Sequence, residues 1–207
     1  HVLIDIPYGK FAKVSYNEAK RIKKNFIKMA RKFNLKLKVV FTDGNKPVGN
    51  GVGPNLEARD IISVLTLSHS RPRGLEKKSL MLSSELLFLS GKFSKKESKE
   101  ISREMLYSGL AFKNFLKILK AQDKSFSFEK FKKLSLGKFR KEILAWKKGK
   151  IILIENKKIN ALARMAGCPS DRSAGIYLWK HVGDKIKKGQ KILTIFAETK
   201  QDLDSAY

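Results

Sequence analysis

The pattern that most constrains this chain is a strand, a helix and a second strand within its first 42 residues. Residues 2–7 read VLIDIP, a compact apolar run with β-branched residues, and residues 36–42 read KLKVVFT. Between them, apolar residues recur at spacings of three and four over 19–30, after Asn17, which can act as a helix N-cap. Two strands joined by a crossover of more than a dozen residues form the βαβ unit of a parallel sheet covered by helices. The sequence therefore predicts a parallel-sheet α/β domain.

The rest of the chain divides into further helices and a second domain. Apolar spacing predicts three helices, over 75–90, 94–107 and 108–121. The stretch 123–138 is polar, basic and weakly periodic, as is typical of a linker. Beyond it, short strands, one helix and glycine-containing turns predict a small β-rich unit. We therefore expect domains at 1–122 and 139–207, joined by the linker 123–138.

The chain is strongly basic, with 45 lysines and arginines against 19 acidic residues and a formal charge of +26. Such a charge raises nucleic acid or an anionic membrane as a partner. Here lysine predominates and is spread over most polar faces, whereas readers of phosphate and bases concentrate arginine. We interpret most of the charge as solvated surface and expect no nucleic-acid partner, although it suits small substrates that carry phosphate. A basic nucleic-acid-binding module stays open as an alternative, and its affinity would fall steeply with salt.

The N-terminus and the cysteine content indicate the setting of the chain. An apolar strand begins at residue 2 without an initiator methionine, so we expect the later part of a longer protein. Cys168 is the only cysteine, which excludes an intrachain disulfide and fits a reducing compartment. No apolar run reaches the roughly 18 residues of a spanning helix. We therefore expect a cytoplasmic protein without a membrane role.

Motifs for catalysis are absent from the sequence. The three histidines, His1, His69 and His181, do not lie at metal-ligand spacing from one another or from Cys168. Cys168 precedes a proline in a predicted loop, with no helix N-terminus to lower its pKa. We therefore assign no catalytic residue and no organic cofactor.

Residues 42–60, TDGNKPVGNGVGPNLEARD, place three glycines at alternate positions before a predicted helix. The spacing differs from GxGxxG, and no Gly-Lys-Ser/Thr follows, so neither a dinucleotide fingerprint nor a P-loop is present. A helix that begins near Pro54 would still direct free backbone N–H groups at an anion. Alternatively, the glycines let the chain pass close to neighbouring backbone.

Four segments, taken in order, resemble the thymidine phosphorylase and AMP phosphorylase family, most closely its archaeal-type branch. They are VLIDIPYGKFAKV (2–14), the segment 42–60, AFKNFLKILKAQ (111–122) and AGIYLWKHVGDKIKKGQKILTIFAET (174–199). Subunits of that family have a helical domain, a central α/β domain and a C-terminal hammerhead-like α/β domain. The resemblance implies that residues 1–122 are the later half of the central parallel-sheet domain, and that 139–207 are the small hammerhead-like domain.

The resemblance implies a pentosyltransferase. In the family, inorganic phosphate as co-substrate cleaves the N-glycosidic bond of a nucleoside monophosphate such as AMP, or of a pyrimidine nucleoside, and yields free base and a sugar 1-phosphate. It also implies that the glycine-rich phosphate loop and the base-binding serine and lysine precede residue 1, so these 207 residues alone are expected to be inactive. Family members are homodimers held largely by the helical domain, so the resemblance leaves the oligomeric state of this chain open.

A potassium site is implied by the resemblance to the bacterial pyrimidine-nucleoside members. There, two backbone carbonyls and one carboxylate hold the ion together with groups from an upstream glycine-rich loop. The carbonyl positions fall on Val48 and Gly51, and the carboxylate position falls on Asp60. Hard cations prefer such oxygen ligands, and glycines let carbonyls converge. Asp60 replaces a glutamate of those members and is one methylene shorter. The alternative is that Asp60 bonds a neighbouring arginine or backbone group.

A carrier function is the alternative from another class. VGDKIKKGQKILTIFAETK resembles the hairpin of biotinyl and lipoyl carrier domains, in which a lysine at a tight turn carries the cofactor. Lys200 would be that lysine. The lipoyl pattern Glu-Thr-Asp-Lys lacks its aspartate here, and the hammerhead architecture explains the likeness without a cofactor.

Overall fold

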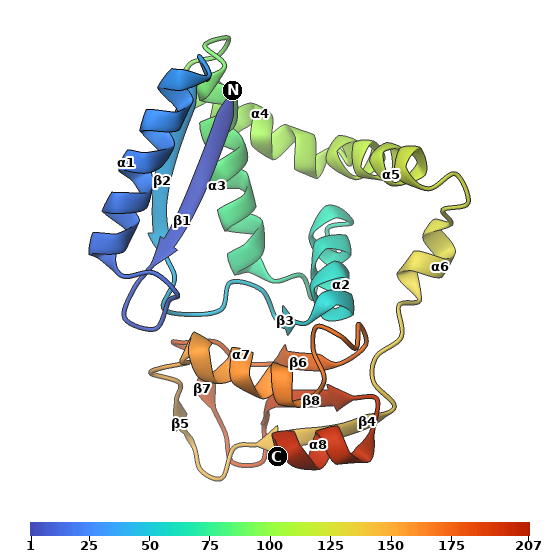
Figure 1. Ribbon diagram of the computed structural model, residues 1–207. Coiled ribbons are helices and arrows are strands. Elements are labelled where there is room, and N and C mark those ends of the chain that lie inside the picture. Colours follow the sequence, from blue (N-terminus) through green and yellow to red (C-terminus); the bar gives the residue numbers. More distant parts are fainter.

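The computed structural model describes residues 1–207, except for the side chain of Lys130 (Figure 1). It begins with β1 (Val2–Tyr8), α1 (Tyr16–Lys32) and β2 (Leu37–Asp43). The two strands are parallel and in register from Val2 opposite Leu37 to Tyr8 opposite Asp43. The predicted βαβ unit is therefore present.

The N-cap of α1 is Ser15, so the prediction of Asn17 was wrong. Glu18 and Ser15 form a capping box, in which the backbone N–H of Ser15 donates to Glu18 Oε2 at 2.8 Å and the Ser15 hydroxyl accepts from the Glu18 amide. Two reciprocal bonds satisfy two free N–H groups of the helix end, which Asn17 cannot do from within the first turn.

Helices dominate the next part of the chain, and their bounds lie close to those predicted. They are α2 (Pro54–Leu65), α3 (Arg73–Leu89), α4 (Lys95–Tyr107) and α5 (Leu110–Gln122), and α2 follows the short strand β3 (Gly51–Val52). Helices α1 and α3 both contact β1 and β2, and α4 packs on α3. Figure 1 shows α1 along one side of the strand pair and α3 along the other.

The C-terminal part follows a predicted linker that contains one short helix, α6 (Phe128–Lys132). Its elements are β4 (Phe139–Leu144), β5 (Gly149–Lys150), α7 (Asn156–Met165), β6 (Gly175–Leu178), β7 (Lys185–Ile186), β8 (Lys191–Ala197) and α8 (Lys200–Ala206). One antiparallel sheet has the order β3-β6-β8-β4, and β5 pairs with β7. Strand β3 thus crosses from the first predicted domain into the sheet of the second.

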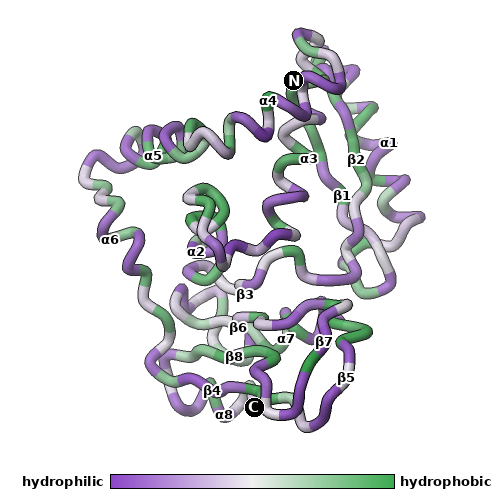
Figure 2. Tube along the Cα trace, turned by 180° about the vertical axis from the view of Figure 1, so that it is seen from behind, coloured by the Kyte–Doolittle hydropathy of each residue, from purple (hydrophilic) through white to green (hydrophobic). Residues whose placement is uncertain are grey.

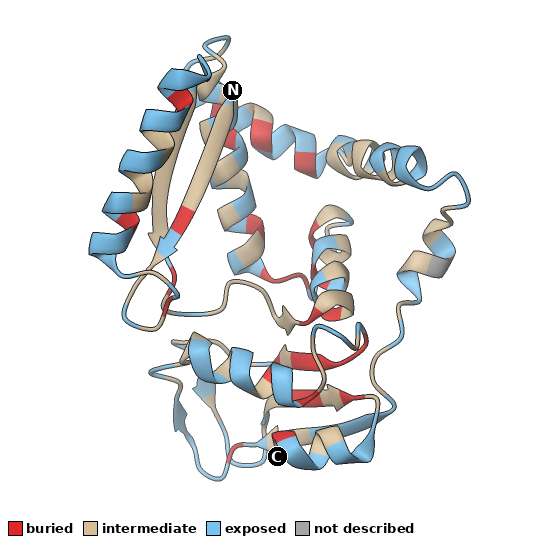
Figure 3. Ribbon diagram, in the orientation of Figure 1, coloured by how far each residue is buried: buried red, intermediate tan, exposed pale blue. Residues whose placement is uncertain are grey.

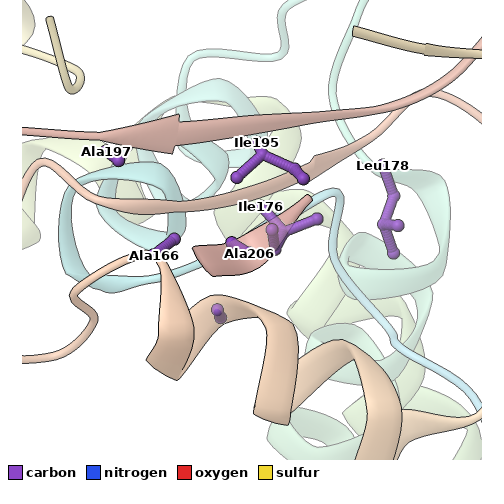
Figure 4. Close-up of a cluster of buried hydrophobic side chains, with 7 residues drawn as sticks. Ala166, Ile176, Leu178, Ile195, Ala197 and Ala206 are labelled. Carbon is purple, nitrogen blue, oxygen red and sulfur yellow. The ribbon is translucent and has the colours of Figure 1, made fainter. Parts of the chain in front are cut away.

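The main core lies between this sheet and two helices. Ile176, Leu178 and Ile195 are at most 2% exposed and pack with small residues of α7 and α8, namely Ala163, Ala166 and Ala206 (Figure 4). Hydrophobic stretches follow β6 and β8 in Figure 2, and buried residues gather on the same strands in Figure 3. Because side chains alternate along a strand, Tyr177, Thr194 and Phe196 belong to the opposite face of the sheet.

The fold is a mixed α/β structure, as predicted. The larger parallel sheet, of which β1 and β2 would be part, stays a prediction, and so does the division into domains at 1–122 and 139–207. No helix in the described part of the chain is long and apolar enough to cross a membrane.

Candidate functional site

The carboxyl ends of β1 and β2 open into a crevice. Ligands of α/β proteins bind at this edge, because the loops that follow parallel strands meet there. Two pockets, of about 690 and 430 Å³, lie on either side of the segment that follows β2. Asp43, Lys46 and Lys78 line both of them. The crevice is therefore the best candidate for a small-molecule site.

Lys78 is held at this edge by two residues from the strands. Its Nζ donates to Asp5 Oδ2 at 2.6 Å and to Thr42 Oγ1 at 3.1 Å, and the Thr42 hydroxyl donates to Asp5 Oδ1 at 2.7 Å. The lysine side chain is only 21% exposed. This network fixes an amine from α3 over the ends of both strands.

Asp43 is the carboxylate that lines both pockets of the crevice. Its Oδ1 accepts from the backbone N–H of Asn45 at 2.9 Å and from Asn45 Nδ2 at 2.8 Å, and these bonds lower the pKa of Asp43. Lys46 Nζ lies 3.8 Å from the other oxygen. Asp43 is thus ionised near neutral pH, and its side chain is about half exposed.

An ion pair beneath the crevice sets the position of α3. Glu76 is 5% exposed and accepts from Arg71 Nε at 2.7 Å, from Arg73 Nη1 at 3.1 Å and from the Tyr107 hydroxyl at 2.5 Å. The bond from Arg71 is the main reason that the pKa of Glu76 falls from 4.5 to about 2. Arg71 also donates to two carbonyls of the preceding loop at 3.0 Å, so the pair fixes the turn that places Lys78.

The glycine loop before α2, which contains Gly49, Gly51 and Gly53, packs closely against neighbouring backbone. This is the second of the two interpretations of its glycines given above. A Cβ atom on Gly51 would lie 2.6 Å from the backbone of Leu56, and one on Gly53, whose φ is +129°, would lie 2.5 Å from the Ala174 carbonyl oxygen. The N-terminus of α2 donates from the Asn55 amide to the Arg172 carbonyl at 3.0 Å. Protein backbone, rather than an anion, therefore accepts from this helix end.

Asp60 is the residue that fixes the loop. Its Oδ2 accepts from the backbone N–H groups of Asn50 at 2.7 Å and Gly51 at 2.8 Å, and the residue is 4% exposed. Burial raises the pKa of Asp60, and the two amide bonds oppose that shift. Val48 lies at the other end of the loop, where its carbonyl would be 2.8 Å from a Cβ atom on Gly74. The structure thus joins Gly51 to Asp60, and the potassium site at Val48, Gly51 and Asp60 stays a prediction.

The C-terminal unit binds the other side of the loop. Asn50 Oδ1 lies 2.8 Å from His181 Nε2, and Asn50 Nδ2 donates to the Tyr177 hydroxyl at 3.2 Å. Burial lowers the pKa of His181, so its ring is neutral near pH 7. Farther along, Asn156 Nδ2 donates to the Gly44 carbonyl at 2.7 Å. Sequence reasoning placed His181 beside a turn and missed this contact, because no spacing rule connects it with Asn50.

The remaining candidates of the sequence take structural positions. Lys200 is the first residue of α8, behind the N-cap Thr199, and does not have the tight-turn position that the alternative carrier function requires. Burial raises the pKa of the Cys168 thiol, so the thiol is protonated near neutral pH. Among the described residues, no group of three His, Cys, Asp or Glu side chains can hold a metal ion.

The C-terminal α/β unit is similar to a known domain class. Residues 151–207 match the family model "Pyrimidine nucleoside phosphorylase C-terminal domain". The whole chain is 37% identical to a Legionella pneumophila protein named "Putative thymidine phosphorylase", over 207 residues, which are 100% of this chain and 39% of that protein. Proteins of the same name from a Bradyrhizobium strain (38% over 197 residues, 95% of this chain and 38% of that protein) and from Rhodopseudomonas palustris (37% over 206 residues, 99% and 39%) are equally similar.

These similarities confirm the resemblance found in the sequence. The chain is related along its whole length to proteins of the thymidine phosphorylase family. It spans about two fifths of the length of these curated relatives.

Replacing Glu76 by Gln should destabilise the protein by about 3–5 kcal/mol, because Arg71 would stay buried without its anion. The pKa of Glu76 is lowered on folding, so its contribution is present above about pH 4.5 and is lost as pH falls toward about 2. Urea unfolding at several pH values measures both effects. Glu104→Gln, on an exposed position of α4, is the control and should change stability by about 0.5 kcal/mol or less. A similar effect of the two variants would contradict the assignment.

Proposed function

We propose that this chain is part of a phosphorylase that cleaves the N-glycosidic bond of a nucleoside. The main support for this proposal is the crevice at the carboxyl ends of β1 and β2. The relation of the chain to the thymidine phosphorylase family supports it as well. Asp43 and Lys78 face the reacting molecule there. The sequence alone does not identify a catalytic residue. Lys78 becomes a candidate only through its contacts with Asp5 and Thr42, which the structure shows.

The reaction is a displacement at the anomeric carbon. An oxygen of inorganic phosphate forms a bond to that carbon, the bond from carbon to the base nitrogen breaks, and its electron pair leaves with the base, which takes up a proton. The transition state has oxocarbenium character, so a carboxylate near the sugar and a cation near the base both stabilise it. Ionised Asp43 would be the carboxylate near the sugar, and the Lys78 amine would be the cation near the base. Lys78 can also donate a hydrogen bond to the departing base.

A pyrimidine nucleoside is the proposed substrate, since thymidine is the nucleoside in the names of the relatives. A nucleoside monophosphate such as AMP is the second candidate, and the charge of the larger pocket favours it. Arg71 and Arg73 bond Glu76, Lys78 bonds Asp5, and Lys46 lies 3.8 Å from Asp43. In all, five cationic side chains line that pocket. They are Lys46, Arg71, Arg73, Lys77 and Lys78. A 5′-phosphate would find partners among them.

The complete catalytic site would require segments outside these residues. The relatives are more than twice as long, and the family resemblance places the phosphate loop in the part that this chain does not span. We therefore propose that the 207 residues alone are inactive, that residues 1–122 form the later half of a central α/β domain, and that residues 139–207 form the hammerhead-like domain. A cytoplasmic location is part of the same proposal, and the oligomeric state of this chain stays open.

In the full protein, Lys78→Met should lower kcat/KM for phosphorolysis about 100-fold, because the methionine keeps the shape but not the charge at the crevice. Release of free base from thymidine and from AMP, with and without phosphate, measures the activity and selects the substrate. The control is Lys96→Met, at an exposed position of α4 remote from the crevice. Undiminished activity of a folded Lys78→Met protein would refute the role of the crevice.

The potassium site makes a separate prediction. Asp60→Ala in the full protein should weaken the dependence of activity on potassium, since the carboxylate would be one of the ligands. Choline chloride at equal ionic strength controls for salt, and thermal unfolding of each variant controls for folding. Asp60→Asn keeps an oxygen for the amides of Asn50 and Gly51 but removes the charge. An unchanged potassium response in both variants would exclude the site.

A further inference from the structure

A third pocket, of about 560 Å³, lies on the far side of β3 from the crevice, between α2 and the C-terminal sheet. Figure 1 shows α2 above β3 and β6, with the chain after α6 passing beside the sheet. The proposed reaction makes no use of this pocket. Its size lies within the range of pockets that hold small ligands.

The floor of the pocket is the sheet face that does not pack on α7 and α8. Tyr177, Trp179 and Phe196 alternate with the buried core residues of β6 and β8, and so all three reach this face. The rings of Tyr177 and Trp179 lie 4.6 Å apart in an edge-to-face arrangement. The Trp179 Nε1–H donates to Thr194 Oγ1 at 2.8 Å, which fixes the indole, while 48% of the residue stays exposed. An exposed aromatic surface held by its own hydrogen bond is suited to stacking against a flat ring.

The walls of the pocket are cationic. Arg59 comes from α2, Lys132 from α6, and Arg140 from β4, where it lies opposite Phe196. Among the side chains that the structure describes, none forms an ion pair with these three. The single carboxylate of the lining, Asp60, is bound to the amides of Asn50 and Gly51. The pocket therefore combines an aromatic floor with three cations that three separate elements bring together.

We propose that this pocket binds a nucleoside phosphate, at a site separate from the crevice. The base stacks on the exposed ring of Trp179, beside Tyr177, and the phosphate pairs with Arg59, Arg140 and Lys132. Stacking accepts any base, whereas the cations require the phosphate. Asp60 lines this pocket and also holds the loop of the crevice, so a bound nucleotide lies against the residue that connects the two sites.

The fluorescence of Trp179 tests the proposal in the full protein. The chain has two tryptophans, and Trp146→Phe leaves Trp179 as the only one within these residues. With Lys78→Met in the same protein, so that the crevice is altered, titration with AMP or UMP in phosphate-free buffer should quench this fluorescence. Adenosine and inorganic phosphate should each bind about tenfold more weakly or worse.

Arg140→Gln and Arg59→Gln should each weaken the AMP response about tenfold, whereas Arg21→Gln, at an exposed position of α1, should not change it. Quenching that survives in the Arg59→Gln/Arg140→Gln double variant would overturn the proposal. So would a Trp179 that an added quencher cannot reach, since the rest of the protein would then cover the pocket. An oligonucleotide that binds about 100-fold more tightly than AMP, with a steep salt dependence, would instead indicate a nucleic-acid surface.

Failure of the nucleotide site and failure of the proposed phosphorylase function give different results. Phosphorolysis by the wild type without any AMP response of Trp179 would refute the nucleotide site between α2 and the C-terminal sheet alone. An AMP response in a protein without phosphorolysis would refute the proposed function alone.

Discussion

The buried carboxylate of Asp60 is the constraint on which the arrangement of both parts of the chain depends. It lies on α2 and accepts two amides of the loop that leads into β3. A buried carboxylate is tolerated only when hydrogen bonds compensate its lost hydration. Because the loop supplies those bonds, α2 and β3 are fixed to each other. Strand β3 then pairs with β6, so the first part of the chain is joined to the C-terminal sheet by backbone bonds.

The same loop, with β3, separates the two candidate ligand sites. On one side, Asp43 and Lys78 line the crevice at the ends of the parallel strands; on the other, Trp179 and Arg140 line the pocket beneath α2. Asn50 connects the loop to His181 and Tyr177 from the C-terminal unit. A displacement of Gly51 would therefore alter the shape of both pockets, and this makes the glycine loop a structural junction.

Local patterns in the sequence predicted most of the helices. The helix expected over 94–107 is α4 (Lys95–Tyr107), because its apolar spacing and its capping box, Ser94 with Glu97, are both encoded within a few residues. Strand β3 was not predicted, since Gly51 and Val52 carry no strand signal and their partner β6 lies far along the chain: Asn50 and Tyr177 are 127 residues apart.

The candidate site was harder to predict than the fold. The glycine loop was identified from its composition, and its close packing was one of two open interpretations. Lys78 looked like any other lysine in a chain with 45 basic residues, and its contacts with Asp5 and Thr42 depend on how α3 packs against β1 and β2. The class of reaction came from the family resemblance, because the spacing of apolar residues indicates secondary structure and not chemistry. The charge of Asp60 was visible in the sequence, but its partners were not.

Amide hydrogen exchange at Gly51 tests the central role of Asp60 most directly. The Gly51 N–H points away from β6 and donates to Asp60 Oδ2, so this carboxylate is the cause of its protection. Slow exchange is therefore expected at Asn50 and Gly51 in the wild type. In Asp60→Ala, exchange should be about tenfold or more faster at both, with the core amide of Ile195 unchanged. Fast exchange in the wild type, or equal protection in the variant, would contradict this role of Asp60.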